Sequence, residues 1–295
     1  MMRLVPWWFK IIVKLILSRF PLGYPTWRRL NLFLHGNMTD PQYAQGIFLR
    51  HTRNAQIDPA GKTILEIGPG DSLFTALVAK AYGASRVHLI DDGRFAIRDL
   101  QRYRTMIAHL RRDALSLSST LDETTNLEEL LHASNAAYST QGLRSLKELP
   151  SQSVDFIFSH AVLEHVSVRE LPELIKETAR VLKPGGACSH TIDLADHLGG
   201  ALNNLRFSTR FWESAFMREA GFYTNRLRLS DYITAFKNAG LDAAITRKET
   251  WQALPTPRAR MAPEFQQYTI EDLLIREVDV VLRLLPESPV SVANP

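Results

Sequence analysis

Residues 63–77, TILEIGPGDSLFTAL, decide the fold of this chain. The apolar run from Thr63 to Ile67 ends at the turn Gly68-Pro69-Gly70, and a continuous apolar run of this length is typical of a strand buried on both faces. Apolar residues at helical spacing follow the turn, and Asp71 or Ser72 is expected to cap their helix. A strand, a tight turn and a helix form the first half of a βαβ unit, so the segment predicts a parallel sheet.

The glycine turn favours a ligand without phosphate groups over a dinucleotide. A dinucleotide fingerprint requires a third glycine at the position where this chain has Leu73. The carboxylate of Asp71 would also lie where a pyrophosphate binds, and like charges repel at short range. The alternative interpretation is a turn that joins strand to helix and binds nothing.

The pattern Glu66-x-Gly68-x-Gly70, with Asp91 ending the next predicted strand, resembles the nucleotide-binding motif of class I S-adenosylmethionine-dependent methyltransferases. This resemblance implies an α/β fold, a Rossmann-like, doubly wound sheet of seven mostly parallel strands. It also implies that S-adenosylmethionine is the cofactor. Gly68, Pro69 and Gly70 would then let the backbone approach its methionine and ribose parts. Asp91 would accept hydrogen bonds from the ribose diol.

Two later segments carry the same resemblance. Residues 154–166, VDFIFSHAVLEHV, begin with a buried strand, and residues 180–186, RVLKPGG, turn the end of a helix into a further strand. Polar Ser159 and His160 emerge at the end of the first of these strands. The resemblance therefore implies that both contact the cofactor.

The adenine contact departs from the family pattern. Members of the family usually carry an acid after the third strand, which is expected here near residue 138. This chain offers Gln141, Gly142 and Leu143 at that place. Gly142 and Leu143 are therefore the candidate contacts for the adenine.

His165 and Asp193 are the candidate catalytic residues. Methyl transfer from a sulfonium requires donor and acceptor atoms in line, and a hydroxyl acceptor must also lose its proton. His165 follows the fourth predicted strand and Asp193 lies in the fifth, so both should emerge at the carboxyl edge of a parallel sheet. Some sugar and natural-product methyltransferases use a histidine and an aspartate from these places. The resemblance suggests His165 as the general base and Asp193 as the residue that orients it, while a loop-packing role for His165 is the alternative.

A divalent metal is a second interpretation of this edge. Carboxylate and imidazole groups there could hold an ion that acidifies an acceptor diol. The residues concerned are Glu164, His160, Asp193, Asp196 and His197. Because no tight ligand spacing supports such a site, no metal is predicted.

Three parts are expected along the chain. Residues 1–54 form an N-terminal helical extension or lid, residues 55–285 the cofactor-binding methyltransferase domain, and residues 286–295 a flexible tail. Tyr43, Phe48 and His51 are candidate lid residues. A helical insertion is expected over 208–220, after the fifth strand, where ligands bind in open α/β sheets. The polar stretch 113–137 is interpreted as an insertion outside the core.

Residues 4–20, LVPWWFKIIVKLILSRF, are apolar but interrupted by Lys10, Lys14 and Arg19. Their uninterrupted apolar stretches are shorter than the ~20 residues of a membrane span, and lysines inside the stretch argue against a signal peptide. On a helix the lysines share one narrow stripe and leave a wide apolar face. This helix either lies in a membrane interface or packs on a protein surface, and the sequence leaves both open.

Composition narrows the partners and the compartment. A net charge of +4, without a long basic run interleaved with aromatic residues, does not indicate nucleic acid. The chain has one cysteine, Cys188, which excludes an intramolecular disulfide framework and agrees with a reducing compartment. The expected location is the cytoplasm, with peripheral contact at the inner face of the membrane through residues 4–20.

The predicted function is methyl transfer from S-adenosylmethionine to an oxygen of a small molecule, sugar or glycan precursor. A non-catalytic methyltransferase-like subunit, which binds the cofactor or nothing, is the alternative. Intact Glu66, Gly68, Gly70 and Asp91 favour the enzyme, whereas the missing adenine acid favours the subunit.

Overall fold

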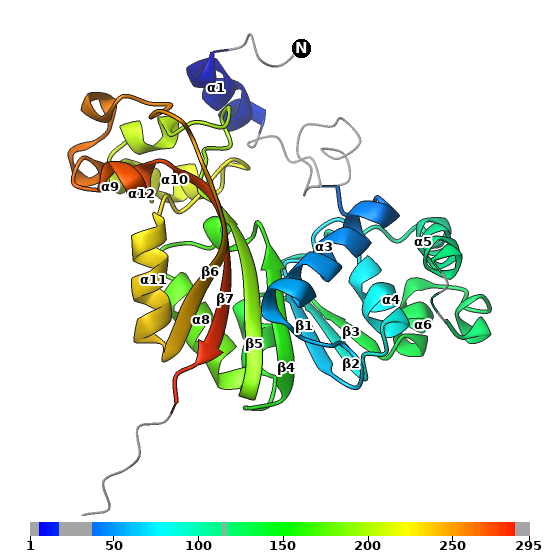
Figure 1. Cartoon of the computed structure of the whole chain (residues 1–295). Helices are drawn as coiled ribbons and strands as arrows, with labels where there is room; N and C mark the ends of the chain where they lie inside the picture. Colours follow the sequence, from blue (N-terminus) through cyan, green and yellow to red (C-terminus); the bar gives the residue numbers. More distant parts are fainter. Residues whose placement is uncertain (1–5, 18–36, 114, 116, 287–295) are drawn as a thin grey trace, which may run out of the picture.

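A single seven-stranded sheet forms the centre of the protein, with the strand order β3-β2-β1-β4-β5-β7-β6 (Figure 1). The computed structural model describes residues 6–17, 37–113, 115 and 117–286. The strands are β1 (Thr63–Ile67), β2 (Arg86–Ile90), β3 (Ala136–Ser139), β4 (Val154–His160), β5 (Leu182–Asp193), β6 (Leu241–Thr250) and β7 (Ile275–Leu284). Strands β1 to β5 pair in parallel, and β7 runs antiparallel to both of its neighbours. The predicted mostly parallel sheet is confirmed.

The strand order reverses between β1 and β4, and this reversal places the functional site. From β1 the chain builds outward through β2 to β3, and it then returns to add β4 on the other side of β1. In open α/β sheets such a switch point opens a crevice at the carboxyl ends of the strands. Ile64 and Leu65 of β1 are fully buried on opposite faces, so the strand that carries the glycine turn is fixed from both sides.

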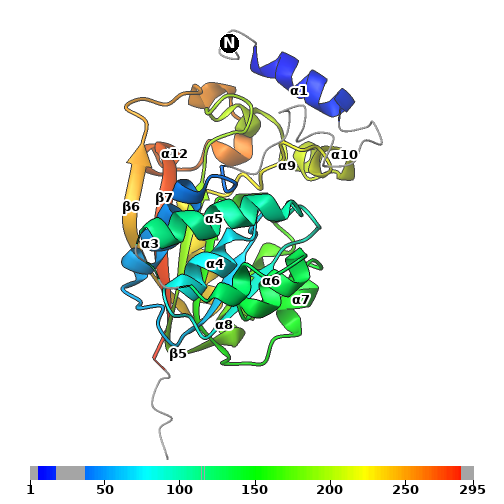
Figure 2. The same ribbon diagram turned by 90° about the vertical axis from the view of Figure 1, so that its right-hand side faces the viewer.

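Helices cover both faces of the sheet (Figures 1 and 2). One buried apolar cluster joins the sheet to α3 (Pro41–Ala55), α4 (Phe74–Ala81), α5 (Leu100–Arg112) and α6 (Leu127–Ala133). A second cluster joins the opposite face to α7 (Leu143–Lys147), α8 (Leu171–Val181) and α11 (Leu229–Asn238). The chain is therefore doubly wound, as predicted.

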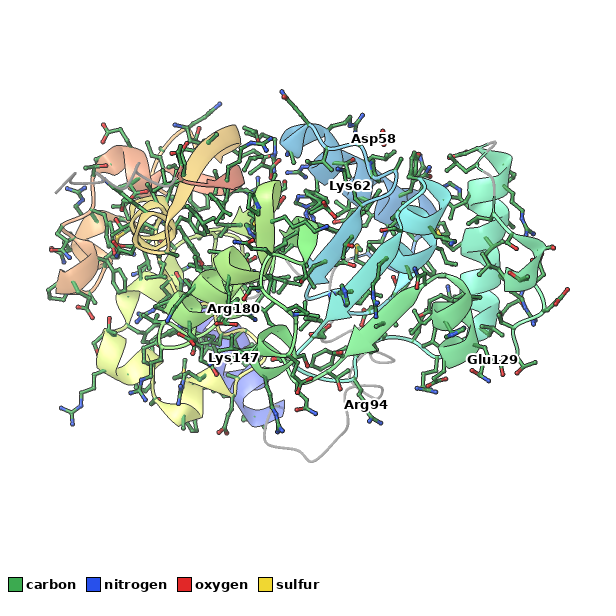
Figure 3. The ribbon with its side chains drawn as sticks, turned by 90° about the horizontal axis from the view of Figure 1, so that it is seen from below. Asp58, Lys62, Arg94, Glu129, Lys147 and Arg180 are labelled. Carbon is green, nitrogen blue, oxygen red and sulfur yellow. The ribbon has the colours of Figure 1, made fainter. Side chains whose placement is uncertain are left out.

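Charged groups fasten α7 to α8 (Figure 3). Arg180, near the end of α8, donates to the backbone carbonyls of Leu149 at 2.9 Å and Leu146 at 3.2 Å. Lys147 of α7 forms an ion pair of 3.0 Å with Glu173 of α8. These contacts satisfy carbonyl groups at the end of the short helix α7.

Two sequence interpretations of helical segments are wrong. Neither Asp71 nor Ser72 caps α4, which begins at Phe74 without a side-chain cap, because the hydroxyl of Ser72 donates to the Met38 carbonyl instead. Residues 113–137 are not separate from the core. Leucines of this stretch are buried in the same cluster as α4 and α5; they are Leu121, Leu127, Leu130 and Leu131.

The predicted insertion after β5 is present but divided. Glu213 and Ser214 separate α9 (Thr209–Trp212) from α10 (Ala215–Arg218). Both helices lie beyond the carboxyl ends of the strands (Figure 1). The remaining short elements are α12 (Ile270–Leu273) and the 3₁₀ turns Ser119–Leu121, Leu163–His165, Asn203–Arg206, Arg258–Arg260 and Pro263–Phe265.

The N-terminal helix α1 (Trp7–Leu17) packs on this insertion with one side only. Ile11 is buried in a cluster with Trp212 of α9 and Met217 of α10, and Trp7 and Leu15 pack against the same cluster. The other side of α1 carries apolar side chains that are 46–55% exposed, namely Trp8, Phe9, Ile12 and Ile16. Among the described residues, no helix combines the length and apolar character that crossing a bilayer requires.

The predicted division of the chain at residues 54 and 285 stays a prediction. Residues 18–36 of the N-terminal extension and 287–295 of the tail lie outside the described part of the chain. Within that part, α3 begins at its cap Asp40, whose side chain accepts a hydrogen bond of 2.8 Å from the Tyr43 N–H.

A buried carboxylate ties α3 to the antiparallel strands. Asp279 of β7 is 1% exposed and accepts hydrogen bonds from Arg50 at 2.6 Å, Arg247 at 3.0 Å and Thr191 at 2.7 Å. Burial alone raises the pKa of Asp279, but the hydrogen bonds from Arg247 and Arg50 outweigh it and bring the pKa to about 2. The carboxylate therefore stays ionised and holds elements that are distant in sequence.

Replacing Asp279 by alanine should lower the free energy of unfolding by about 3 kcal/mol, because it removes the buried one of the two carboxylates that Arg50 and Arg247 share and leaves only the more exposed Glu277. The matched control is Thr191→Val, which removes one hydrogen bond to the same carboxylate and should cost about 1 kcal/mol. Urea unfolding of the three proteins measures both values. Equal losses in the two variants would contradict a stabilising role for the arginine pairs.

The same contact predicts a pH dependence of stability. The pKa of Asp279 in the folded state, about 2, lies below the ~3.9 of an unfolded aspartate. Its stabilisation is therefore fully present above about pH 4 and is lost as the pH falls toward about 2. The variant Asp279→Asn should lose this part of the pH dependence in acid unfolding.

Candidate functional site

The glycine turn lies at the carboxyl edge of the sheet, between β1 and α4. Gly68 has φ +73° and Gly70 has φ +64°, values that side chains other than glycine rarely adopt. The Gly68 N–H donates to the Ile90 carbonyl at 2.8 Å, and the Gly70 N–H donates to Oδ2 of Asp91 at 2.9 Å. The structure thus brings the predicted turn and the predicted acid at the end of β2 together.

Two buried carboxyl groups flank the turn. Burial raises the pKa of Asp91 to about 7, although the Gly70 N–H opposes this shift. Burial also raises the pKa of Glu66 to about 8. Oε2 of Glu66 is buried and has no hydrogen-bond partner among the described residues. Both acids can therefore take further hydrogen bonds from a ligand that enters the turn.

The predicted adenine contacts lie beside the end of β2. The Gly142 N–H donates to the backbone carbonyl of Asp91 at 2.8 Å, and Leu143 begins α7 directly after it. A Cβ atom at Gly142, where φ is +51°, would come within 3.3 Å of Cβ of Asp92. Asp92 is exposed and places a carboxylate next to this glycine. This acid follows β2, whereas the family pattern led us to expect one after the third strand.

Ser159 and His160 point to opposite faces of the sheet. Ser159 is fully buried and its Oγ lies 2.8 Å from Nδ1 of His190, so its side chain belongs to the core beneath α11. Because its side chain is in the core, Ser159 can contact a cofactor only through its backbone. Nε2 of His160 lies 3.3 Å from the Tyr43 hydroxyl. Burial lowers the pKa of His160 to about 4, so its imidazole is neutral near pH 7.

The three candidate lid residues on α3 have different environments. Tyr43 is half-buried and reaches the end of β4 through its contact with His160. Phe48 and His51 are fully buried, and Nδ1 of His51 lies 2.8 Å from Oγ of Ser189. Phe48 and His51 therefore pack in the core, and Tyr43 alone of the three faces the candidate site.

His165 is exposed on the 3₁₀ turn that follows β4. Its Nδ1 lies 3.0 Å from the backbone carbonyl oxygen of Tyr223. A carbonyl oxygen can only accept, so Nδ1 must carry the proton of this hydrogen bond. In the neutral ring the basic lone pair is then on Nε2. This tautomer is the one that a general base needs.

Asp193, which was predicted to orient His165, makes a different contact. Its Oδ2 lies 3.5 Å from Nε2 of His197, and its Oδ1 accepts a hydrogen bond of 2.9 Å from the Ala195 N–H. The rings of His165 and His197 are 4.8 Å apart, centroid to centroid. Asp193 therefore lies beside His197, whose ring neighbours that of His165, and the group at Nδ1 of His165 is the Tyr223 carbonyl.

Glu164, His165 and His197 form the compact group that could hold a metal ion among the described residues. Their ligand atoms all lie within 4.8 Å of one another. Burial raises the pKa of Glu164 well above its usual value, and its Oε2 has no hydrogen-bond partner in the described part of the chain. Of the other residues considered for a metal, Asp196 instead accepts backbone N–H groups of the loop after β5, from Leu198 and Asn203 at 3.1 and 2.6 Å.

Comparison with known proteins adds to this geometry. A family model described as "Methyltransferase domain" matches residues 41–244. The chain is similar to the structure of an S-adenosylmethionine dependent methyltransferase from Mesorhizobium loti, at 17% identity and a TM-score of 0.43, over 78% of this chain and 94% of that one. It is similar to the YcgJ protein from Bacillus subtilis at 15% identity and a TM-score of 0.45, over 84% and 100% of the two chains.

A third similar structure is phosphoethanolamine N-methyltransferase 2 from Haemonchus contortus. Its sequence identity is 16% and the TM-score is 0.47, over 96% of this chain and 61% of that one. No curated protein matches the chain.

Replacing Asp91 by alanine should weaken the binding of S-adenosylmethionine by ~1–3 kcal/mol, the range for loss of a charged hydrogen-bond partner. Isothermal titration calorimetry measures the affinity. The control is Asp58→Ala, which removes a carboxylate at an exposed site far from the turn (Figure 3). An unchanged affinity in Asp91→Ala would mean that the ligand binds elsewhere.

The variant Gly68→Val should abolish the binding of S-adenosylmethionine. Even a Cβ atom at Gly68 would lie 2.6 Å from Cγ2 of Val162, so a side chain there displaces the turn itself. The variant Val162→Ala removes the opposing methyl groups and should retain binding in the same titration. Normal affinity in Gly68→Val would contradict a ligand at this turn.

Proposed function

This chain belongs to the methyltransferase-domain family and uses S-adenosylmethionine as its cofactor, and from that premise we propose that it methylates an oxygen atom of a small-molecule or sugar acceptor with His165 as the general base. The family match covers residues 41–244, which include the glycine turn, His165 and Asp193. The acceptor, the methylated atom and the base are the proposed parts.

The residues around the turn fit this cofactor. Gly68 and Gly70 have the positive φ values that this tight turn requires, and Asp91 and Glu66 offer oxygen atoms to hydroxyl and amino groups. When bound, S-adenosylmethionine supplies an electrophilic methyl group. Gly68, Gly70, Asp91 and Gly142 would hold it at the carboxyl edge.

The proton arrangement of His165 carries the proposal. Its Nδ1 donates to the Tyr223 carbonyl, so Nε2 can take the proton that a hydroxyl acceptor must lose. The ring is exposed and therefore open to an acceptor. The imidazolium that results is stabilised at Nδ1 by the same carbonyl, and the carboxylate of Asp193 lies one ring away, behind His197. Both effects favour the protonated product of base catalysis.

A metal-assisted reaction is a second candidate, because one observation favours it. The buried carboxylate of Glu164 lies within 4.8 Å of the ligand atoms of His165 and His197, and its Oε2 has no hydrogen-bond partner among the described residues. A divalent ion held by these three residues would lower the pKa of a bound acceptor hydroxyl. In that case His165 acts as a ligand and cannot act as the base.

Replacing His165 by alanine should lower turnover by roughly a hundredfold and leave the cofactor affinity unchanged, since general-base catalysis contributes that order of rate. Turnover is measured with a labelled methyl donor over a panel of hydroxylated acceptors. His132→Ala, which changes an exposed histidine on α6, is the matched control.

Two outcomes of the same assay would contradict His165 as the base. One is near-normal turnover in His165→Ala together with a rate that does not vary between about pH 5 and 8, where histidines ordinarily titrate. The other is loss of wild-type turnover in a chelator and its return on adding a divalent ion, which supports the metal-assisted reaction instead.

We also propose that α1 holds the enzyme at the inner face of a membrane, as a peripheral protein of the cytoplasm. The exposed side chains Trp8, Phe9 and Ile12 form an apolar strip on a helix whose sequence includes two lysines. Such a helix favours an interface with anionic lipids. The opposite side of α1 is fixed to α9 and α10, which would place the insertion near the lipid surface.

Two tryptophan variants separate membrane contact from packing. Trp8→Ala should reduce the blue shift of fluorescence on adding anionic vesicles and leave the melting temperature unchanged, because Trp8 is 51% exposed. Trp7→Ala should lower the melting temperature, because Trp7 packs against Phe207 with ring centroids 6.1 Å apart. Added salt should weaken vesicle binding. The absence of co-sedimentation of the wild type with vesicles would rule out the membrane contact.

A further inference from the structure

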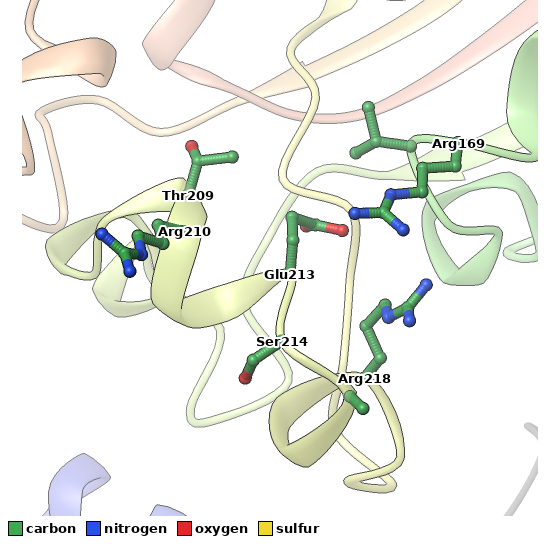
Figure 4. Close-up of a pocket in the computed structure, with 8 residues that line it drawn as sticks. Arg169, Thr209, Arg210, Glu213, Ser214 and Arg218 are labelled. Atoms are coloured by element: carbon green, nitrogen blue, oxygen red, sulfur yellow. The ribbon is translucent and has the colours of Figure 1, made fainter.

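A cavity lined by arginine side chains opens beside the insertion, between α9, α10 and the loop that follows His165 (Figure 4). Its volume is about 560 Å³. The polar residues that line it are Arg169, Thr209, Arg210, Glu213, Ser214 and Arg218. Figure 4 shows Arg169 and Arg218 directed into the space beside Glu213, with Arg210 on the far side of α9.

The charges in this cavity are unbalanced. Two guanidinium groups, those of Arg169 and Arg218, lie beside one carboxylate, Glu213, which already accepts hydrogen bonds of 2.9 and 3.1 Å from the Tyr223 hydroxyl. Nε of Arg218 is buried and has no hydrogen-bond partner within the described residues. A buried donor without a partner is costly, so a site of this kind favours an anion that accepts from it.

Two guanidinium groups beside each other match a phosphate. The planar fork of an arginine donates two parallel hydrogen bonds to a carboxylate or a phosphate, but a phosphate has three acceptor oxygens and more negative charge, so it can accept from two arginines at once. Thr209 and Ser214 also line the cavity, but the Ser214 hydroxyl already donates to the Phe211 carbonyl at 2.7 Å, so the arginines are the donors that a ligand would meet. The volume admits a phosphate group with part of the molecule that carries it.

One residue joins this cavity to the proposed catalytic base. The Tyr223 hydroxyl donates to Glu213 in the cavity, while the Tyr223 carbonyl accepts the Nδ1 proton of His165. Arg169 follows His165 in the same loop. The cavity and the ring of His165 are therefore joined by the same residue and lie next to each other in the fold.

We propose that this cavity binds the phosphate group of the methyl acceptor, so that the acceptor is a phosphate ester with a free hydroxyl. This inference rests on the proposed function for the role of the ligand, but not for the binding of phosphate. The ester is either a soluble phosphorylated compound or the headgroup of a lipid. Exposed Phe211 and Phe216, on the helices that line the cavity, would face the acyl region in the second case.

Inorganic phosphate is the probe for the binding step, titrated calorimetrically at constant ionic strength. The wild type should bind it with a dissociation constant below about 10 mM. Arg169→Gln should weaken this binding roughly tenfold, because it removes a charge-assisted hydrogen bond from an exposed side chain whose loss should not affect folding. Arg218→Lys keeps the charge but loses the fork and should also weaken binding.

Two further variants should strengthen phosphate binding or leave it unchanged. Glu213→Gln removes the like charge from the cavity and should strengthen phosphate binding. Arg144→Gln, an exposed arginine on α7 whose side chain is 78% exposed, should leave it unchanged. Equal phosphate affinity in the wild type, Arg169→Gln and Glu213→Gln, or no heat in the wild type, would overturn the inference.

The cofactor titration of the same preparations separates this inference from the proposed function. If the wild type binds S-adenosylmethionine but not phosphate, the cavity assignment is overturned and the proposed function is not. Binding of phosphate by a protein that does not bind the cofactor supports the cavity and contradicts the proposed enzyme. Vesicles of phosphatidylglycerol that compete with phosphate in the wild type, but not in Arg169→Gln, identify a lipid headgroup as the source; a lack of competition identifies a soluble ester.

Discussion

The hydrogen bond from the Gly70 N–H to the Asp91 carboxylate, 2.9 Å long, is the contact on which the site depends. Asp91 ends β2 in a buried position, where removing its charge from water is unfavourable and raises its pKa to about 7. The Gly70 N–H offsets part of this cost, and a donor can point there only because Gly70 has φ +64°. Backbone conformation and buried acid therefore stabilise each other. The same contact fastens the turn after β1 to the end of β2.

The parallel sheet brings the other functional groups to the same edge. Strands β1, β2, β4 and β5 all end there, so the turn, Asp91, His165 and Asp193 lie together although they are far apart in sequence. The insertion after β5 closes over this edge. Tyr223, which follows the insertion, accepts from Nδ1 of His165 through its carbonyl and donates from its hydroxyl to Glu213 in the arginine cavity. Under the proposed function, Tyr223 would link proton removal to recognition of the acceptor.

Most of the fold could be predicted from the sequence because the central strands are continuous apolar runs. The turn and the acid at the end of β2 were also predictable, since only a few residue types suit those positions. The orientation of the Ser159 side chain could also have been predicted from the strand. Side chains alternate between faces, so with Phe158 packed beneath α3, Ser159 must point to the other face and into the core.

Other parts of the site could not be derived from the sequence. The carbonyl of Tyr223 has no sequence signal, since every residue carries one, and its approach to His165 depends on how the insertion folds. The contact between Asp193 and His197 likewise follows from the loop after β5, which Asp196 shapes by accepting backbone N–H groups. Helix α1 was ambiguous because it combines both expected environments, one side packed and the other exposed.

A crystal structure with bound S-adenosylhomocysteine would test the central claim, that the turn Gly68–Gly70 and Asp91 form the cofactor site, most directly. The account predicts the ribose hydroxyls within hydrogen-bond distance of the Asp91 carboxylate, the homocysteine part along Gly68 and Gly70, and the sulfur on the side of the edge that His165 faces. A ligand bound away from this turn, or crystals that show none at saturating concentration, would contradict it.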